Sequence, residues 1–163
     1  MSLNKVIRGV PLAAVLAVGL ALGACANNPN ANGAQANGAM ATPGSQQDFV
    51  VNVGDRVFFD TDSSELSAQA RATLDKQAQW LTQYGRYQFT IEGHADERGT
   101  REYNLALGAR RAQTVRDYLV SRGIAANRMH TISYGKERPV AVCDDISCWS
   151  QNRRAVTVLN ASS

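Results

Sequence analysis

The chain lacks three features that mark large classes of protein. No block of Lys and Arg, and no interleaving of basic with aromatic residues, indicates a nucleic-acid surface. The longest apolar run, residues 10–24, is short and contains glycine, so it does not predict a membrane span. No Ser or Cys nucleophile motif accompanies the 2 histidines. We therefore expect no nucleic-acid partner, no cofactor and no enzymatic activity.

The amino terminus has the pattern of an export signal. Lys5 and Arg8 precede the apolar run, which closes with Leu22-Gly23-Ala24 before Cys25. This predicts a signal peptide over residues 1–24, and an uncleaved signal anchor is the alternative. Its removal takes away two positive charges and lowers the formal net charge from +3 to +1. The basic charge of the full chain therefore says nothing about partners.

The signal ends in a sequence similar to a bacterial lipobox. This similarity implies lipidation of Cys25, cleavage before it and anchoring in a membrane. Ala26, in place of an acidic residue, favours the outer membrane by resemblance to lipoprotein sorting signals. The following residues, up to Gln47, are mostly Ala, Asn, Gly, Gln and Pro, and cannot form a core. We therefore expect a lipidated amino terminus and flexible linker over residues 25–47, and a globular domain over residues 48–163.

The domain alternates strand-like and helix-like segments. The strand-like runs are residues 56–59, 87–91, 130–134 and 155–159. Ser67 is a candidate cap for a helix that stops near Gly85, and a second helix is expected from Tyr103 or Asn104 to Arg122, with Gly123 after it. This order predicts an α+β fold in which two main helices pack on one face of a mixed four-stranded sheet.

Two cysteines remain in the domain, Cys143 and Cys148. In an exported chain their spacing favours a small-loop disulfide. A metal site is the alternative, but two thiolates here lack the nearby third and fourth ligands of a structural zinc site. We therefore expect a disulfide and no metal.

The charged residues gather after the second predicted strand, in Gly93-His94-Ala95-Asp96-Glu97-Arg98-Gly99-Thr100, followed by Arg110 and Arg111. A carboxylate and a guanidinium held on rigid elements can bind the ammonium and the carboxylate of a zwitterion. Two alternatives use the same residues. The charges could form only a structural ion pair, or His94 with Asp96 could begin a metal or acid–base site of a hydrolase.

This motif resembles the OmpA-like carboxy-terminal domain family. The resemblance rests on residues 93–100, Tyr103-Asn104, Leu107, Arg110-Arg111-Ala112, Ser133-Tyr134-Gly135-Lys136 and Asn152-Arg153-Arg154-Ala155. The lipobox, the linker and the Glu-Arg-Gly after Asp96 are similar to the peptidoglycan-associated lipoproteins of that family. The resemblance implies a βαβαββ domain that binds peptidoglycan non-covalently and works with TolB and the Tol complex. Within that frame, a wall-binding domain in another assembly is the competing interpretation.

The resemblance also implies roles for particular residues. Asp96 would bind the ammonium, and Arg111 the carboxylate, of a diaminopimelate side chain in a wall stem peptide. The other residues implied to line the pocket are Asp60, Arg98, Asn104 and Leu107. We expect substitution of Asp96 or Arg111 to abolish wall binding without unfolding the domain. Gly108 stands where many family members have Ser, which predicts a looser start of the second helix.

The expected function follows from these elements together. The chain would be an outer-membrane lipoprotein with its domain in the periplasm, tethering that membrane to the wall and supporting invagination during cell division. Of the two neighbouring arginines, Arg153 and Arg154, at most one can face the pocket because strand residues alternate. The sequence leaves open whether Trp149 packs on the disulfide or faces a partner.

Overall fold

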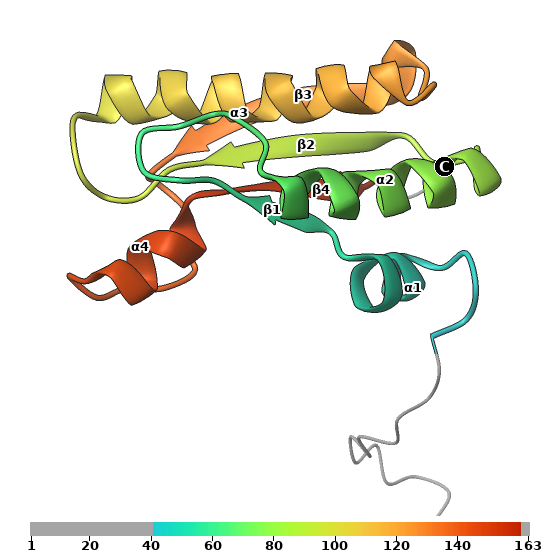
Figure 1. Ribbon diagram of the computed structural model, residues 1–163, viewed down its shortest axis with the longest axis horizontal. Coiled ribbons are helices and arrows are strands. Elements are labelled where there is room, and N and C mark those ends of the chain that lie inside the picture. The colour runs from blue at the N-terminus through green and yellow to red at the C-terminus, as the bar shows by residue number, and fades with distance from the viewer. Residues whose placement is uncertain (1–40, 161–163) are drawn as a thin grey trace, which may run out of the picture. The chain divides into compact units, whose positions relative to one another are not determined.

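The structure is a computed structural model that describes residues 41–160. The predicted signal peptide, Cys25 and the linker up to residue 40 lie outside the described residues. The described part is an α+β domain built on one sheet (Figure 1). None of the helices between residues 41 and 160 combines the length and the hydropathy that a membrane span needs.

The sheet has four strands in the order β1-β4-β2-β3. The strands are β1 (Arg56–Phe58), β2 (Phe89–His94), β3 (Met129–Gly135) and β4 (Arg154–Leu159). β2 and β3 are parallel, whereas β4 runs antiparallel to both β1 and β2. The expected mixed four-stranded sheet is therefore confirmed, and one of its two central strands, β2, leads into the charged motif.

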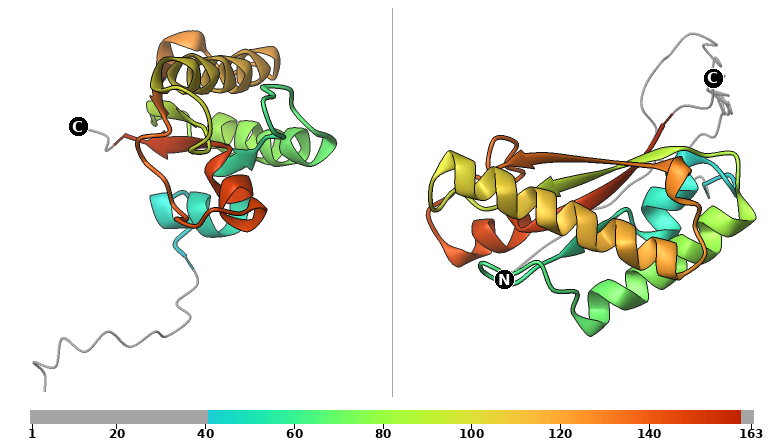
Figure 2. Two further views of the ribbon diagram at one scale, coloured as in Figure 1. Left: turned by 90° about the vertical axis from the view of Figure 1, so that its left-hand side faces the viewer. Right: turned by 90° about the horizontal axis from the view of Figure 1, so that it is seen from above.

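Two long helices, α2 (Ala68–Gln83) and α3 (Arg101–Ser121), cover one face of the sheet (Figure 2). Alternate strand residues such as Val57 and Ile91 meet apolar helix residues such as Leu74 and Val115 in a single core. The predicted two-helix layer is thus confirmed. This core holds the residues of β2 and β4 that lie next to the charged motif. The backbone on which the motif begins is therefore rigid.

The helix ends follow the expected capping chemistry. The Ser67 hydroxyl accepts a hydrogen bond from the Ala70 amide, and Gly123 takes the left-handed conformation after α3. α3 begins at Arg101, earlier than expected, because the Thr100 hydroxyl caps it by accepting from the Tyr103 amide. The charged loop therefore ends directly at the start of α3.

The inward face of α3 is not continuously apolar in its first half. Leu105 is exposed, whereas Asn104, Gly108 and Arg111 are buried. An added Cβ at Gly93 would overlap the Gly108 carbonyl, and one at Gly108 would overlap the Ser133 hydroxyl. Gly108 therefore allows close packing of helix on sheet, and the looser helix start stays a prediction.

Four short helical elements were not predicted as helices. α1 (Gln46–Asp48) runs into a π-helical turn, η1 (Phe49–Val53), and a short 3₁₀ turn, η2 (Ala126–Arg128), precedes β3. Within the predicted linker, Gly44 is buried, its carbonyl accepts from the Tyr87 hydroxyl at 2.8 Å, and its amide donates to Asp48. The packed structure therefore begins before residue 48.

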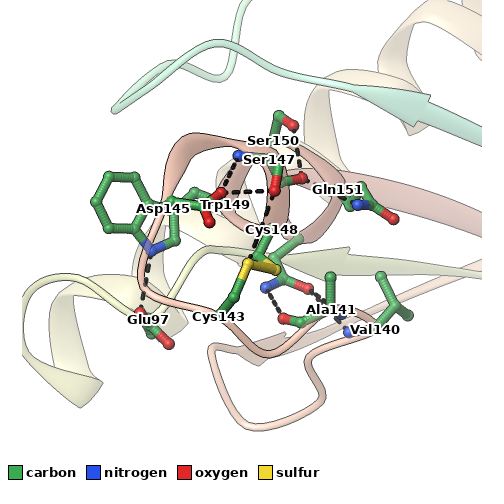
Figure 3. The surroundings of a disulfide bond; sticks show 11 residues. Glu97, Val140, Ala141, Cys143, Asp145, Ser147, Cys148, Trp149, Ser150 and Gln151 are labelled. Carbon is green, nitrogen blue, oxygen red and sulfur yellow. Dashed lines mark hydrogen bonds between the residues drawn. A yellow bond between two sulfur atoms is a disulfide. The ribbon is translucent and has the colours of Figure 1, made fainter.

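α4 (Ile146–Asn152) is the fourth of these elements, and it precedes β4. It includes the second cysteine of the Cys143–Cys148 disulfide, which the structure contains as expected (Figure 3). The sequence pattern does not indicate this helix because Ile146 is exposed and only Cys148 and Asn152 are buried.

Candidate functional site

The charged motif lines a hollow of about 250 Å³ where α3 begins. The lining residues are Thr61, Asp62, Asp96, Arg98, Gly99, Tyr103, Asn104 and Leu107. They come from the segment after β1, the loop after β2 and the first half of α3. We call this hollow the pocket. Four of the six residues expected to bind the wall peptide lie in its lining.

Asp96 is the buried carboxylate of the pocket. Arg98 donates to it twice from its side chain, with Nη2–Oδ2 at 2.7 Å and Nε–Oδ1 at 3.1 Å, and its backbone amide adds a third bond to Oδ1. Burial alone would raise the pKa of Asp96, but the hydrogen bonds and charge of Arg98, with the bond from Arg153, lower it overall. Asp96 is therefore ionised at neutral pH.

Arg111, the other half of the expected pair, lies fully buried beneath the pocket. Its guanidinium donates to the carbonyls of Ser63, His94 and Asp60 at 2.8, 2.8 and 3.0 Å. Burial and the charge of Arg153 lower its pKa to about 10, so it stays charged at neutral pH. Among the described residues, no hydrogen bond or ion pair joins Arg111 to Asp96. Arg111 instead ties the segment after β1 to the end of β2.

The remaining expected residues are placed as follows. Asn104 donates from its side-chain amide to the Arg98 carbonyl at 2.7 Å, which fixes the loop above it. Leu107 is buried and forms the apolar part of the lining. Asp60 is exposed and lines a neighbouring hollow beside Phe58 and Arg153, while its carbonyl holds Arg111. Asp60 thus touches the site through its backbone.

Arg153 is a site residue that sequence reasoning left out. Its Nη1 donates to Asp96 Oδ2 at 3.4 Å and its Nε to the Phe59 carbonyl at 3.0 Å. Arg154 faces away and bonds to the Asn152 and Arg138 carbonyls. Strand alternation does allow one arginine at the pocket, as expected, but only the packed structure decides which one.

Three more lining residues were not among those expected to bind the wall peptide: Thr61, Asp62 and Tyr103. The Tyr103 hydroxyl donates to the Asp62 carboxylate across the mouth of the pocket. Asp62 has a positive φ of 57°, a conformation that Asp tolerates better than most residues. These residues join the segment after β1 to α3, so the pocket wall is closed by side chains from remote parts of the chain.

The loop itself is held from several sides. Lys136 donates to the carbonyls of Glu97 and Gly99 at 3.1 and 2.8 Å, and the Ala95 amide donates to the Gly135 carbonyl. The short distances and several donors indicate a preorganised loop rather than a loose one. A preorganised loop loses little conformational entropy when it binds a ligand.

His94 lies at the end of β2 and is not part of the pocket lining. Neither imidazole nitrogen has a hydrogen-bond partner, and Nε2 is 3.7 Å from Glu92 Oε2. Burial and the charges of Arg154, Arg138 and Arg56 lower its pKa to about 4. His94 is therefore not a structural hydrogen-bond donor among the described residues. Within residues 41–160, no three His, Cys, Asp or Glu side chains gather as metal ligands would.

The geometry suits recognition of a small polar group. The pocket presents an ionised carboxylate, a partly exposed guanidinium and one apolar wall in a small volume. These groups can bind an ammonium beside a carboxylate and discriminate by their fixed spacing.

Sequence comparison places residues 58–155 in the OmpA family. The peptidoglycan-associated lipoprotein of Rhizobium meliloti is 68% identical over 93% of this chain and 89% of that protein. The protein of that name from Brucella melitensis is 65% identical and covers 93% of both chains. The similarity extends well beyond the charged motif.

Solved structures agree with the fold. The crystal structure of the peptidoglycan-associated lipoprotein from Burkholderia pseudomallei matches with a TM-score of 0.63 and 44% identity, over 65% of this chain and 90% of that one. The carboxy-terminal domain of Helicobacter pylori MotB has a TM-score of 0.61 at 21% identity, over 66% of this chain and 84% of that one, and shares the fold alone. The chain is a binding protein and not an enzyme, and it belongs to the peptidoglycan-associated lipoproteins of the OmpA family.

Proposed function

We propose that this chain is an outer-membrane lipoprotein whose periplasmic domain binds peptidoglycan non-covalently and tethers that membrane to the cell wall. Its relatives are named for their association with peptidoglycan, and its sequence carries a lipobox at Cys25. The observation that carries the proposal is the buried, ionised Asp96 at the base of a small polar pocket in this domain.

The ligand is the diaminopimelate side chain of a stem peptide, which ends in an ammonium and a carboxylate. Asp96 binds the ammonium through Oδ2, where the Arg153 bond is long at 3.4 Å and is the weakest of the four that the carboxylate accepts. Arg111 is assigned to the carboxylate. Because Arg111 is fully buried, the ligand reaches it only if the segment at Asp60–Ser63 moves aside.

The other assigned residues shape the pocket. Arg98 adds positive charge at the rim, Asn104 fixes the loop, Leu107 packs against the ligand's methylene chain and Asp60 holds Arg111. A single exposed polar site of this kind binds weakly. Many lipid-anchored copies on a polymeric wall hold firmly because each bound copy raises the effective concentration of the next.

We further propose that the domain contacts TolB and the Tol complex and supports envelope integrity and outer-membrane invagination at division. This part rests on the family alone, and it is tested by whether the purified domain binds purified TolB. Mass analysis of the mature protein tests the anchor. An unmodified Cys25, or retention of residues 1–24, would count against it.

The central experiment is co-sedimentation of the mature domain with purified peptidoglycan. We expect wild type to sediment, and Asp96→Asn to remain in the supernatant because the ammonium loses its counter-charge. Glu65→Gln is the matched control, since Glu65 is an exposed carboxylate in the neighbouring hollow. Equal sedimentation of Asp96→Asn and wild type would contradict the assigned site. Release of soluble muropeptides during the incubation would overturn the assignment as a binding protein.

A further inference from the structure

The segment before β4 is closed by internal covalent and polar links. It lies against the loop after β2, residues 95–100, which we call the pocket loop. The disulfide joins Cys143 to Cys148, with their Cα atoms 5.6 Å apart. The side chain of Asn152 accepts from the amides of Val140 and Ala141 and donates to the Ala141 carbonyl. We call residues 140–152 the disulfide hairpin. Its shape is set by these covalent and polar links, because it buries few side chains of its own.

Trp149 extends from the disulfide hairpin to the pocket loop (Figure 3). Its indole Nε1 donates to Glu97 Oε1 at 3.0 Å, on the residue directly after Asp96. The guanidinium carbon of Arg98 lies 4.2 Å from the centre of the Trp149 ring. One side chain therefore contacts both residues that follow Asp96.

We propose that Trp149 is a positioning residue of the wall-peptide pocket, and that the Cys143–Cys148 disulfide keeps it in place. The inference rests on the proposed function, because it concerns the same pocket. The line of contacts runs from the disulfide through α4 to Trp149, from Trp149 to Arg98, and from Arg98 to Asp96. Trp149 does not touch the ligand in this proposal.

The physical reason lies in the exposure of Arg98. Its side chain is 41% exposed, and a long exposed arginine has many rotamers from which to choose. The Trp149 face favours the one rotamer in which the guanidinium also meets both oxygens of Asp96. The carboxylate is then already oriented when a ligand arrives. Binding therefore costs less side-chain conformational entropy.

The test measures binding of a soluble muropeptide that carries a diaminopimelate stem peptide. We expect Trp149→Ala to weaken binding about three- to fivefold, the loss typical of one cation–π contact. Trp149→Phe keeps an aromatic face and should recover most of the affinity. Val142→Ala is the matched control, because Val142 is an exposed apolar residue of the same hairpin. It should bind as wild type does.

A spectroscopic readout separates positioning from general stability. Ligand addition should change the tryptophan fluorescence of wild type, because Arg98 stacks on Trp149. Trp149→Phe retains only the buried Trp80 and should show no such change while it still binds. The double variant Cys143→Ser/Cys148→Ser should lose affinity as Trp149→Ala does, with Trp149 more mobile by fluorescence anisotropy.

The outcomes distinguish the two proposals. If wild type does not bind the muropeptide, the proposed function fails, whatever Trp149 does. If wild type binds, and Trp149→Ala binds as tightly or more tightly, the positioning role is overturned. Should Trp149→Ala not fold by circular dichroism, Trp149→Leu replaces it. Equal affinity of the Leu and Phe variants would then overturn the role of the aromatic face.

Discussion

Arg98 binds the carboxylate of Asp96 with two side-chain nitrogens, from only two residues along the chain. Arg111, which the family resemblance pairs with Asp96, bonds instead to three backbone carbonyls beneath the pocket. The pocket thus has an accessible cation at its rim and a buried one under its floor. The two arginines are expected to differ sharply in what their replacement does.

Arg111→Lys should destabilise the domain by about 3 kcal/mol, because one ammonium cannot reach three diverging carbonyls and buried acceptors are left unpaired. This differs from the expectation that replacing Arg111 spares the fold. Urea unfolding measures the effect. Arg110→Lys is the control, since Arg110 is exposed and only approaches the Tyr103 ring. Equal stability of the two variants would contradict a structural role for Arg111.

Asp96 should make the free energy of unfolding depend on pH in the acidic range. Its pKa is lower in the folded state than the ordinary value near 3.9, so its ionised form stabilises the fold above about pH 4. That contribution is lost as the pH falls through the folded-state pKa. Unfolding curves at successive pH values should show wild type more stable than Asp96→Asn at neutral pH, with the gap closing in acid. A gap independent of pH would refute this linkage.

His94 should act in a different pH window. Its pKa is lowered to about 4 in the fold, against about 6.5 when unfolded. Between these values the unfolded chain binds a proton that the folded chain does not, so stability falls as the pH decreases from about 6.5 to 4. The variant His94→Phe should lose this slope. An imidazole titration of wild type by nuclear magnetic resonance with a midpoint above 6 would count against it.

Gly93→Ala should destabilise the domain by about 2 kcal/mol, as overpacking does, because the new Cβ would overlap the Gly108 carbonyl on α3. Thermal unfolding measures the shift. Gly85→Ala is the matched control, because no neighbouring atom lies within 4 Å of a Cβ at that position. If both variants unfold at the wild-type temperature, α3 is free to move away from β2.

Much of the fold was predictable because it depends on local patterns. Ser67 and Gly123 mark helix ends through their own backbone chemistry, and alternation in Phe89–Ile91 marks a half-buried strand. α4 was missed because it buries almost no apolar surface and therefore has no periodic signal. Phe58 lies in the first predicted strand yet is 49% exposed, because it points to the sheet face that lacks α2 and α3.

The sequence alone determined the order along the chain of the four strands and the two main helices, the disulfide and the location of the charged motif at the end of β2. Only the tertiary structure decided the partners of the charges. Arg98 and Arg153 reach Asp96, whereas three carbonyls from two separate segments, the one after β1 and the end of β2, hold Arg111. A charged side chain bonds to whichever acceptor the packing brings near it. For Arg111 those acceptors are backbone carbonyls, and a pattern of residue types does not show where backbone carbonyls lie in the fold.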